Sequence, residues 1–583
     1  MHTFKVWAPL ARSLAVETGG RRHPMEQATR GWWSASVAAA GPGTDYAFIV
    51  NGEEPAVPDP RSQWQPQGIH GPSRIYDHAA FQWTDGSWQA PPLAGGVIYE
   101  AHVGTFTPAG TLDAAIGKLD YLKELGITHV EWMPLATAPG DRGWGYDGVD
   151  LFAPLEAYGG PDATKRFVDA AHTKGLAVLI DVVYNHFGPV GNYVNKFGPY
   201  TTESHVTPWG GAVNFEGEDS DGVRRFFCDN ALMWLRDYHF DGLRVDAVHA
   251  FIDRSAIHFL EQLGDEVKAL GSATGRHYVV IAESDLNDPR LVSATEAGGY
   301  GLDAQWSDDF HHALWTVLTG ETIGYYQDFG GMADLARALR EVFVYQGQYA
   351  PYRRRNHGRP VLGLPGYRFL GFIQNHDQIG NRAQGERLGH VVDIGRVKIA
   401  AALVLTSPFV PMLFAGEEFA ASTPFQYFTD HHDPEMGRLV SEGRKKEFAA
   451  FGWKPDDVPD PQDKATFDRS KLNWSEITEQ PHAEVLEWHR RLIALRRSHR
   501  SLTDGRMHRV DVRFDEQSQW LVVRRGQILV ACNFGNDAAL IELPDSCKVL
   551  LASGAAATHL TGAQLSLPSE TVAVLAIVSD DLR

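Results

Sequence analysis

The pattern of hydrophobic and polar positions changes twice along the chain. Residues 1 to about 90 contain short hydrophobic runs, such as FKVWAP, WWSASV and DYAFIV, between turns rich in Gly and Pro. Short runs of this kind predict β-strands, and their number predicts a small β-sandwich. The segment 55–72 carries five prolines and no helical pattern. It therefore predicts an extended arm that leads out of the sandwich.

From residue 96 the pattern predicts strands that alternate with helices. Eight short apolar runs have the form of parallel strands buried on both faces; they are 96–102, 129–135, 177–185, 242–248, 277–284, 302–306, 368–377 and 408–416. The clearest helix between them is 112–125, with apolar residues on one face and Gly126 as its C-cap. Eight such units predict a (β/α)₈ TIM barrel with insertions. From the pattern alone, an open doubly wound sheet is the alternative.

Two further segments complete the predicted organisation. Residues 187–225, between the third and fourth strands, are rich in Gly, Tyr, Pro and Trp and predict a loop subdomain that overhangs the site. After a helix at 484–497 the chain returns to strand-like runs, which predict a second β-sandwich. We therefore expect a multidomain protein. Its predicted parts are an N-terminal immunoglobulin-like β-sandwich at 1–90, a catalytic barrel at 91–500 and a C-terminal β-sandwich at 501–583.

Charge and composition narrow the classes of partner. The net charge is −20, from 53 basic and 73 acidic residues, and this argues against nucleic acid, which is bound through Lys and Arg. The three cysteines are too few and too scattered for a disulfide framework or a zinc site. The first residues contain no apolar signal core, and prolines split the long uncharged stretch 399–416. We therefore expect a cytoplasmic protein with no membrane segment.

Three carboxylates follow predicted barrel strands. Asp246 ends the fourth strand, Glu283 the fifth and Asp377 the seventh. In a barrel these positions share one rim, where catalytic residues lie. Glycoside hydrolysis needs one protonated and one ionised carboxyl group. Any one of the three could instead be a structural cap or an ion-pair partner, but together, with Arg and His beside them, they predict a catalytic cleft.

Four short motifs give a specific resemblance. In order they are DVVYNH (181–186), GLRVDAV (242–248), AES (282–284) and QNHD (374–377). They resemble the motifs of glycoside hydrolase family 13, the α-amylase family. The resemblance implies a retaining hydrolase of α-linked glucans, with Asp246 as nucleophile and Glu283 as general acid and then base. Asp377 would grip sugar hydroxyls and stabilise the transition state.

The same resemblance implies supporting residues and raises a question about metal. Arg244 would orient Asp246, His186 and His376 would bind the sugar on the non-reducing side of the cut, and Tyr146 would form an aromatic platform beneath it. Many α-amylases continue the fourth-strand motif with Lys-His, where this chain has His249-Ala250. That His normally shares a calcium site with the Asn that matches Asn185. We therefore expect Asn185 to be a structural hydrogen-bonding residue, and no required metal or cofactor.

Longer stretches narrow the resemblance within the family. The stretches 306–315, 375–388, 415–432 and 460–474 resemble the trehalohydrolase branch over essentially the whole chain. This implies cleavage of the α-1,4 bond next to the terminal trehalose of maltooligosyltrehalose, in trehalose biosynthesis. The implied pathway partner is maltooligosyltrehalose synthase. Trp306, Asp309 and His311 are expected to form the wall that receives the trehalose, with loop packing as the alternative for these three residues.

Several alternatives stay open at this level. A glucan branching transferase would share the covalent intermediate, and a debranching hydrolase would share the scaffold. A non-catalytic glucan-binding homologue would typically lose one of the carboxylates. The N-terminal domain either binds glucan or only packs against the barrel. The basic stretch 351–360 is interpreted as a solvated insertion, with lid or glucan contact as the alternative.

Overall fold

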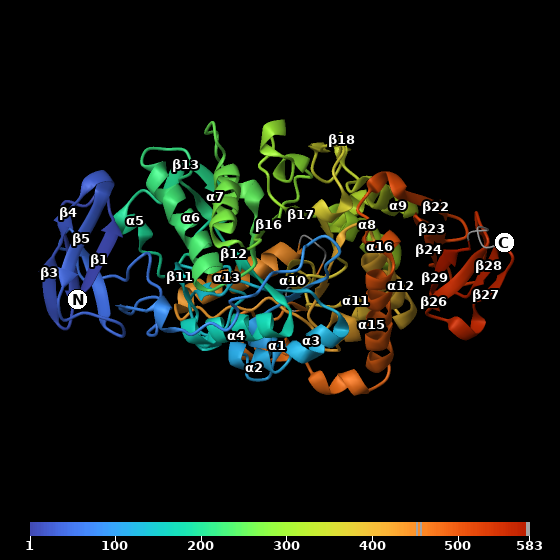
Figure 1. The fold of residues 1–583 in the computed structure, drawn as a ribbon, viewed down its shortest axis with the longest axis horizontal. Coiled ribbons are helices and arrows are strands. Elements are labelled where there is room, and N and C mark those ends of the chain that lie inside the picture. Colours follow the sequence, from blue (N-terminus) through green and yellow to red (C-terminus); the bar gives the residue numbers. More distant parts are fainter. Residues whose placement is uncertain (450–452, 455–456, 579–583) are drawn as a thin grey trace.

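The protein is elongated, with a barrel between two smaller β domains (Figure 1). The computed structural model describes residues 1–449, 453–454 and 457–578. The last five residues of the predicted C-terminal domain, 579–583, lie outside the described residues. The domain boundaries at residues 90 and 500 stay predictions. Among the described residues, no helix combines the length and apolar character that crossing a membrane requires.

The N-terminal domain is a sandwich of two antiparallel sheets. One sheet has the order β1 (His2–Trp7), β5 (Trp32–Val37) and β4 (Glu26–Gln27); the other has β3 (Arg21–Pro24), β2 (Leu14–Thr18), β6 (Asp45–Val50) and β7 (Ser73–Arg74). Along β1, Phe4 and Val6 are buried while Lys5 is exposed, which is the alternation of a strand with one face on a core. The arm that follows is attached to the barrel, since the indole N–H of Trp64 donates to Glu156.

The central domain is a closed barrel of eight parallel strands. In chain order they are β8 (Ile98–Ala101), β9 (His129–Trp132), β12 (Ala177–Val182), β15 (Gly242–Val245), β16 (Val279–Ala282), β17 (Ala304–Trp306), β20 (Phe369–Gly371) and β21 (Val410–Phe414). Each lies inside one of the eight predicted apolar runs. The last strand pairs with the first, Met412 opposite Ile98. This closure confirms the TIM barrel and excludes the open sheet.

Helices surround the barrel. The longest are α4 (Gly160–Lys174), α6 (Ser220–Asp237), α7 (Phe259–Thr274), α8 (Asp308–Thr319), α12 (Ile394–Thr406), α13 (Pro434–Ala449) and α15 (His482–Ser498). The predicted helix 112–125 is in fact two, α2 (Leu112–Ile116) and α3 (Leu119–Leu125). Gly117 separates them, and glycine costs a helix interior about 1 kcal/mol. Gly126 ends α3 as predicted, in the left-handed conformation with φ 100°.

Two hairpins project from the barrel on the same side (Figure 1). The first, β13 (Thr201–Thr207) and β14 (Gly210–Val213), belongs to the predicted loop subdomain. The second, β18 (Gln346–Ala350) and β19 (Arg355–Gly358), lies between β17 and β20. Its turn falls within the basic stretch 351–360, which is therefore ordered as a hairpin.

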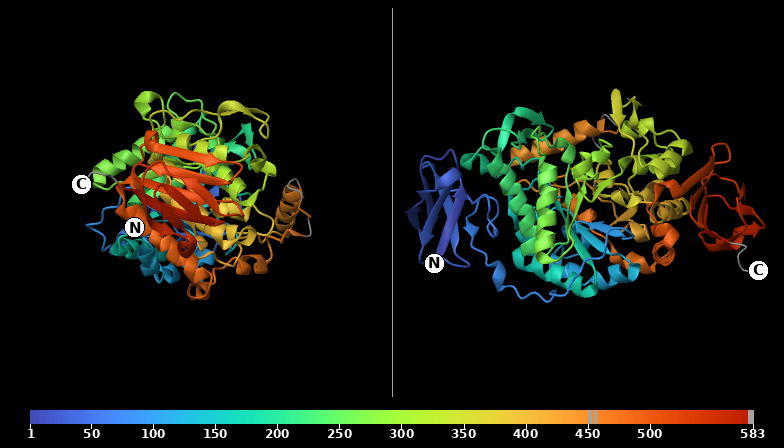
Figure 2. Two further views of the ribbon diagram at one scale, coloured as in Figure 1. Left: turned by 90° about the vertical axis from the view of Figure 1, so that its right-hand side faces the viewer. Right: turned by 45° about the horizontal axis from the view of Figure 1, so that its top comes forward.

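The C-terminal domain is a second sandwich, at the opposite end of the barrel from the first (Figure 2). Its five-stranded sheet has the order β22 (Val510–Asp515), β23 (Trp520–Arg525), β24 (Ile528–Asn533), β29 (Thr571–Ile577) and β26 (Cys547–Ala552). Its smaller sheet consists of β25 (Ala539–Glu542), β28 (Gln564–Leu567) and β27 (His559–Thr561). Apolar side chains of both sheets form one cluster between them, as expected of a sandwich.

A buried arginine holds the end of α12 in place. Arg496 of α15 donates to the carbonyl oxygens of Leu405, Ser407 and Phe409 at 3.0, 3.1 and 2.8 Å. Burial, together with the nearby Arg525, lowers the pKa of Arg496 to about 9. Leu405 belongs to the last turn of α12, and Ser407 and Phe409 belong to its connection with β21. The last carbonyl groups of a helix have no partner within the helix, so Arg496 supplies a donor for them.

Replacing Arg496 with methionine is expected to lower the free energy of unfolding by about 2–4 kcal/mol, because buried carbonyls lose their donor. Chemical denaturation followed by circular dichroism would measure the loss. The matched control is Arg497→Met, an exposed neighbour on the same helix, for which we expect a change within about 0.5 kcal/mol. Equal stability of the two variants would contradict a structural role for Arg496.

Candidate active site

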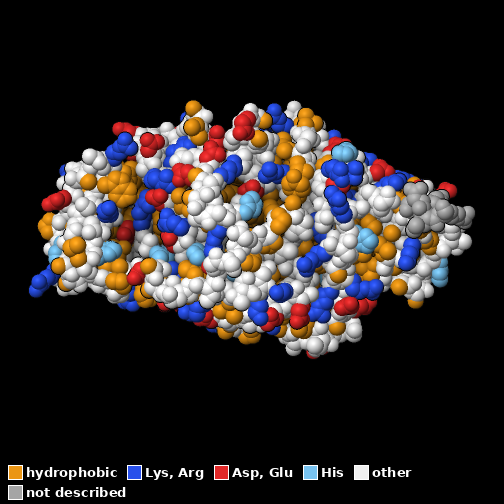
Figure 3. Space-filling view, viewed as in Figure 1, with side chains coloured by type: hydrophobic (Ala, Val, Ile, Leu, Met, Phe, Trp, Pro, Cys, Tyr) orange, Lys and Arg blue, Asp and Glu red, His pale blue; other side chains and the backbone are white. Residues whose placement is uncertain are grey.

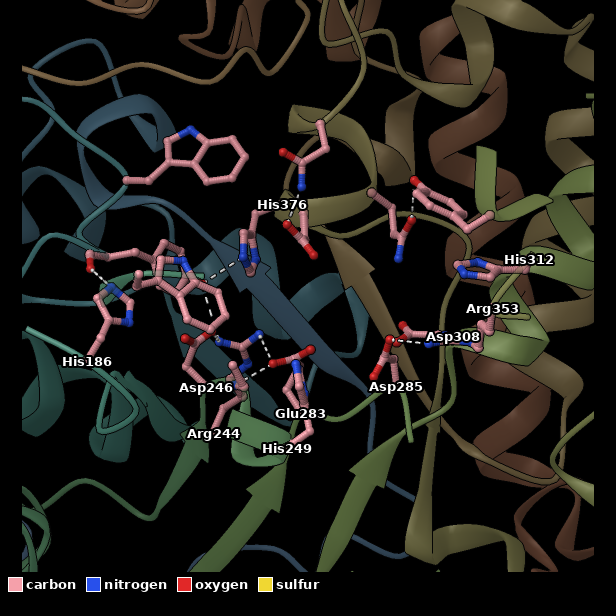
Figure 4. Close-up of a pocket in the computed structure, with 18 of the residues that line it drawn as sticks. His186, Arg244, Asp246, His249, Glu283, Asp285, Asp308, His312, Arg353 and His376 are labelled. Carbon is pink, nitrogen blue, oxygen red and sulfur yellow. Dashed lines mark hydrogen bonds and ion pairs between the residues drawn. The ribbon is translucent and has the colours of Figure 1, made fainter. Parts of the chain in front are cut away.

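A cavity of about 540 Å³ opens at the carboxyl ends of the barrel strands (Figure 4). Seven of the ten site residues predicted from the sequence line it: Tyr146, His186, Arg244, Asp246, Glu283, His376 and Asp377. The barrel therefore brings together side chains from segments that are far apart in the sequence. The remaining three predicted residues, Trp306, Asp309 and His311, do not line it.

Asp246 is held at both carboxylate oxygens. It directly follows β15, and Arg244, two residues earlier on the same strand face, donates to its Oδ1 at 2.7 Å. The side-chain amide of Asn185 donates to its Oδ2, also at 2.7 Å. Arg244 donates to Asp181 as well, at 2.7 Å. A buried guanidinium thus compensates the charge of Asp246 and fixes its direction.

Glu283 lies in a contrasting environment on the adjacent strand. Burial raises the pKa of Glu283 well above its ordinary value; Arg244, 3.7 Å away, opposes this, and Asp246 reinforces it. Its Oε2 accepts a hydrogen bond from the backbone N–H of Ala247. Ala247 directly follows Asp246 and has φ 42°, a left-handed conformation that is strained for alanine. The backbone turn at Ala247 thus links the two carboxyl groups, because the residue that follows Asp246 donates to Glu283.

His376 and Tyr146 form a second polar unit beside Asp246. The Tyr146 hydroxyl donates to Asp181 Oδ2 at 2.6 Å and lies 2.7 Å from His376 Nε2. His376 Nδ1 lies 2.5 Å from Glu100 Oε1. With Glu100 and the Tyr146 oxygen as acceptors, both ring nitrogens of His376 are donors, as in the imidazolium form. Burial alone would lower the pKa of His376, but Glu100 outweighs it and raises the pKa.

His186 forms the end of the cavity that is closest to the loop subdomain. Its Nε2 lies 3.0 Å from the carbonyl oxygen of Tyr146, and its Nδ1 is hydrogen-bonded to the side chain of Asn185. The indole of Trp209 stacks on the His186 ring, with centroids 5.1 Å apart. Trp209 comes from the turn between β13 and β14 and is 46% exposed. Trp209 thus brings the β13–β14 hairpin to the edge of the cavity.

The expectation that Trp306, Asp309 and His311 form a wall of the site is not met by their positions. Trp306 is 1% exposed inside the barrel, with the Arg244 guanidinium 4.4 Å from its ring centre. Asp309 is buried and accepts hydrogen bonds from the backbone N–H groups of Val344 and Tyr345. His311 is 0% exposed. All three side chains are therefore packed inside the protein, which was the alternative to a role in binding trehalose.

Neighbours of these residues line the cavity instead. Asp308 and His312 belong to the first turns of α8, four residues apart and so on one face of the helix. Arg353, from the turn between β18 and β19, forms an ion pair with Asp285 at 3.0 Å. Figure 4 shows this group on the side of Glu283 away from His186. Burial raises the pKa of Asp308 well above its ordinary value, and Asp285 adds to the effect.

The sequence contained a partial signal for this group. The i, i+4 spacing shows in the sequence that Asp308 and His312 share one face of a helix. The sequence does not show which face of that helix points to the cleft, because the preceding apolar strand does not fix the rotation of the helix. Arg353 lay in a basic stretch whose contact with glucan was only the alternative interpretation. Its position on the cavity favours that alternative over a solvated insertion.

The described residues include no cluster of three or more His, Cys, Asp or Glu side chains that could hold a metal ion. The amide of Asn185, which corresponds to a calcium ligand in many α-amylases, donates instead to the backbone oxygen and carboxylate of Asp246. Asn185 therefore helps to hold the carboxylate of Asp246 in place.

Comparison with known proteins gives matches over nearly the whole chain. The family model "Alpha amylase, catalytic domain" matches residues 74–205, and a model of a domain of unknown function matches 505–574. The malto-oligosyltrehalose trehalohydrolase of Rhizobium sp. (strain M-11) is 48% identical, covering 98% of this chain and 97% of its own length. The 1,4-alpha-glucan branching enzyme of Cellvibrio japonicus is 30% identical but covers only 55% of this chain and 49% of its own.

A solved structure extends this similarity to three dimensions. A protein from Salmonella typhimurium, described as a candidate alpha amylase, superposes with a TM-score of 0.90 at 39% identity. The superposition covers 98% of this chain and 97% of that one. The similarity therefore includes both terminal sandwiches as well as the barrel.

Proposed function

Because the chain belongs to the malto-oligosyltrehalose trehalohydrolases of the α-amylase family, we propose that it hydrolyses the α-1,4 bond next to the terminal trehalose of maltooligosyltrehalose. The products are free trehalose and a maltooligosaccharide. The observation that carries the chemistry is the pair Asp246 and Glu283. Asp246 is fixed by an arginine, whereas Glu283 is buried with a raised pKa.

The first step uses the two carboxyl groups in opposite ways. Glu283 gives its proton to the oxygen of the scissile bond while Asp246 attacks the anomeric carbon from the other side. Trehalose leaves with the proton, and the maltooligosyl unit becomes covalently attached to Asp246. A retaining mechanism requires the two carboxyl groups to lie about 5–5.5 Å apart.

The second step reverses the first with water as the acceptor. Glu283, now ionised, takes a proton from a water molecule, and the oxygen of that water attacks the anomeric carbon. The bond between this carbon and Asp246 breaks, and Asp246 leaves as the free carboxylate. Two inversions give net retention, so the maltooligosaccharide is released as the α-anomer. Asp377 and His376 would bind hydroxyls of the reacting sugar, His186 would assist them, and Tyr146 would lie beneath its ring.

We assign the trehalose subsites to Asp308, His312 and Arg353 in place of the residues expected from the sequence. These side chains lie on the side of Glu283 opposite His186, which is where the leaving group must lie if His186 contacts the sugar on the non-reducing side. Carboxyl, imidazole and guanidinium groups together supply the donors and acceptors that a disaccharide with many hydroxyls requires.

The variant Asp308→Asn is expected to lower kcat/KM for maltotriosyltrehalose about ten-fold, the cost of one hydrogen bond to a charged or strongly polar group. Its kcat/KM for α-maltotriosyl fluoride, which has no trehalose, should be unchanged. Asp265→Asn, an exposed position on α7, is the control. Equal losses on both substrates would contradict a role for Asp308 in binding trehalose.

Product analysis distinguishes the proposed function from a glucan branching transferase. Free trehalose and maltotriose from maltotriosyltrehalose, with little change in amylose, would support the hydrolase. Intact maltotriosyltrehalose together with new α-1,6 branches in amylose would favour the transferase. Retention of Asp246, Glu283 and Asp377 argues against a non-catalytic homologue. A cytoplasmic location and a pathway shared with maltooligosyltrehalose synthase are part of the proposal.

A further inference from the structure

A second groove lies beside the active-site cavity, between the N-terminal arm and the loops of the barrel. Its volume is about 700 Å³. Residues 65–70 of the arm form one wall. Residues 137–141, which begin at the end of β10 (Ala136–Thr137), form another. Residues 155–157, Val190, His432 and Asp433 complete the lining.

Chain geometry limits how far this groove can be from the cavity. Asp141 lines the groove and Trp144 lines the cavity, while Val190 lines the groove and His186 the cavity. Because a chain spans at most about 3.6 Å per residue, the Cα atoms in these pairs are no more than about 11 and about 14 Å apart. The segments 141–144 and 186–190 thus each connect the groove with the cavity. The distance between the two hollows is short enough for a few glucose units to span it.

The two segments also lie against each other. The backbone N–H of Gly188 donates to the carbonyl oxygen of Gly148 at 3.0 Å, and His186 Nε2 lies 3.0 Å from the carbonyl oxygen of Tyr146. The groove therefore adjoins the end of the cavity formed by His186, which is opposite Asp308 and Arg353 (Figure 4). That is the end toward which the non-reducing part of the substrate extends in the proposed reaction.

Two polar side chains at this end have unused hydrogen-bonding capacity. The Asp147 side chain is 33% exposed and lies 3.6 Å from His431 Nε2. The other ring nitrogen of His431, Nδ1, is buried and has no hydrogen-bond partner among the described residues. A buried polar atom without a partner is uncommon in folded proteins. The His431 side chain is only 2% exposed, so Asp147 is the member of the pair that a ligand can reach. Asp147 follows Tyr146, which lines the cavity, and His431 precedes His432, which lines the groove, so the chain places this pair next to both hollows.

Neighbouring side chains around the groove also favour a sugar over a charged or apolar ligand. Its lining mixes amide, imidazole and carboxylate groups, such as Gln67, His70 and Asp141, with the apolar Ile69. Acidic groups disfavour an anion in this acidic protein, and the many polar groups disfavour a lipid or an apolar peptide segment. Hydroxyl-rich chains use both donors and acceptors, which this lining supplies.

We propose that the groove binds the non-reducing glucose units of longer maltooligosyl chains, with His432 contacting units in the groove and Asp147 contacting units between cavity and groove. This proposal deepens the proposed function and rests on it for the identity of the substrate. It makes the arm at 65–70 part of the substrate site. The N-terminal module would then contribute to recognition of the substrate without a glucan site on the sandwich itself.

The first experiment measures kcat/KM for trehalose derivatives that carry from two to six further glucose units. His432→Ala should lower the value for the longest substrate about five-fold, as for one neutral hydrogen bond. Val190→Trp, which fills the groove, should lower it further, and both should leave the shortest substrate unchanged. His559→Ala, an exposed histidine on β27, is the matched control. Equal losses at all lengths, or no loss at any length, would overturn the proposal.

The second experiment separates this proposal from the proposed function. In the Glu283→Gln background, calorimetric titration measures binding of maltoheptaose and of maltotriose without turnover. We expect Val190→Trp to weaken maltoheptaose binding and to leave maltotriose binding unchanged. That result supports the groove even if the wild-type enzyme releases no trehalose. If the wild-type enzyme releases trehalose but Val190→Trp does not weaken maltoheptaose binding, the groove proposal is refuted and the proposed function is not.

Discussion

Replacing Asp246 with alanine is expected to reduce kcat for maltooligosyltrehalose by about 10⁴-fold or more, since no covalent intermediate can then form. The overall fold should persist, because Asp246 lies at the solvent-filled cavity rather than in an apolar core. Loss of a buried partner will change the surroundings of Arg244, so circular dichroism and thermal unfolding should accompany the kinetics. A variant with more than about a tenth of wild-type kcat would exclude Asp246 as the nucleophile.

Azide provides a sharper test of the same role. In Asp246→Ala, azide can enter the space left by the carboxylate and attack the anomeric carbon of α-maltotriosyl fluoride directly. A single displacement inverts the configuration, so the expected product is the β-maltotriosyl azide. An α-azide would mean that a covalent intermediate still forms, on some other group. The anomeric configuration, read by NMR, therefore identifies the role of Asp246 independently of the size of the rate loss.

Replacing Glu283 with glutamine should reduce kcat for maltooligosyltrehalose by about 10²–10⁴-fold, the usual contribution of a general acid. The loss in the first step should be much smaller for α-maltotriosyl fluoride, because fluoride leaves without a proton. Azide should then attack the intermediate on Asp246 and give the α-azide, the opposite anomer to that from Asp246→Ala. Equal losses on both substrates would contradict the assignment of Glu283 as the general acid.

The pH dependence tests Glu283 in the unmodified enzyme. The acid must be protonated for the first step, so kcat/KM should fall as the pH rises through the pKa of Glu283. Burial, opposed by Arg244 and reinforced by Asp246, raises that pKa well above the ordinary value of a glutamate. The fall should therefore begin at a higher pH than an exposed glutamate would give, and it should disappear in Glu283→Gln. A fall that persists in the variant would indicate another titrating group.

The barrel and its three carboxylates were predictable from the sequence because both depend on local patterns. All eight strands appear as short, mostly apolar runs, since a strand buried on both faces carries few polar residues. A carboxylate that directly follows such a run must lie at the rim of a barrel. The positions of Asp246, Glu283 and Asp377 could therefore be inferred without knowing how the helices pack.

The wall opposite His186 could be decided only by the tertiary structure. Trp306 was expected in the wall that receives the trehalose, but it is the last residue of β17 and is buried in the barrel interior. The Arg244 guanidinium lies 4.4 Å from its ring centre. On α8, each residue is rotated by about 100° from the last, so that Asp308 faces the cavity while Asp309 faces the backbone of the neighbouring hairpin. The sequence determined which segment follows the strand; helix packing determined which of its residues meets the substrate.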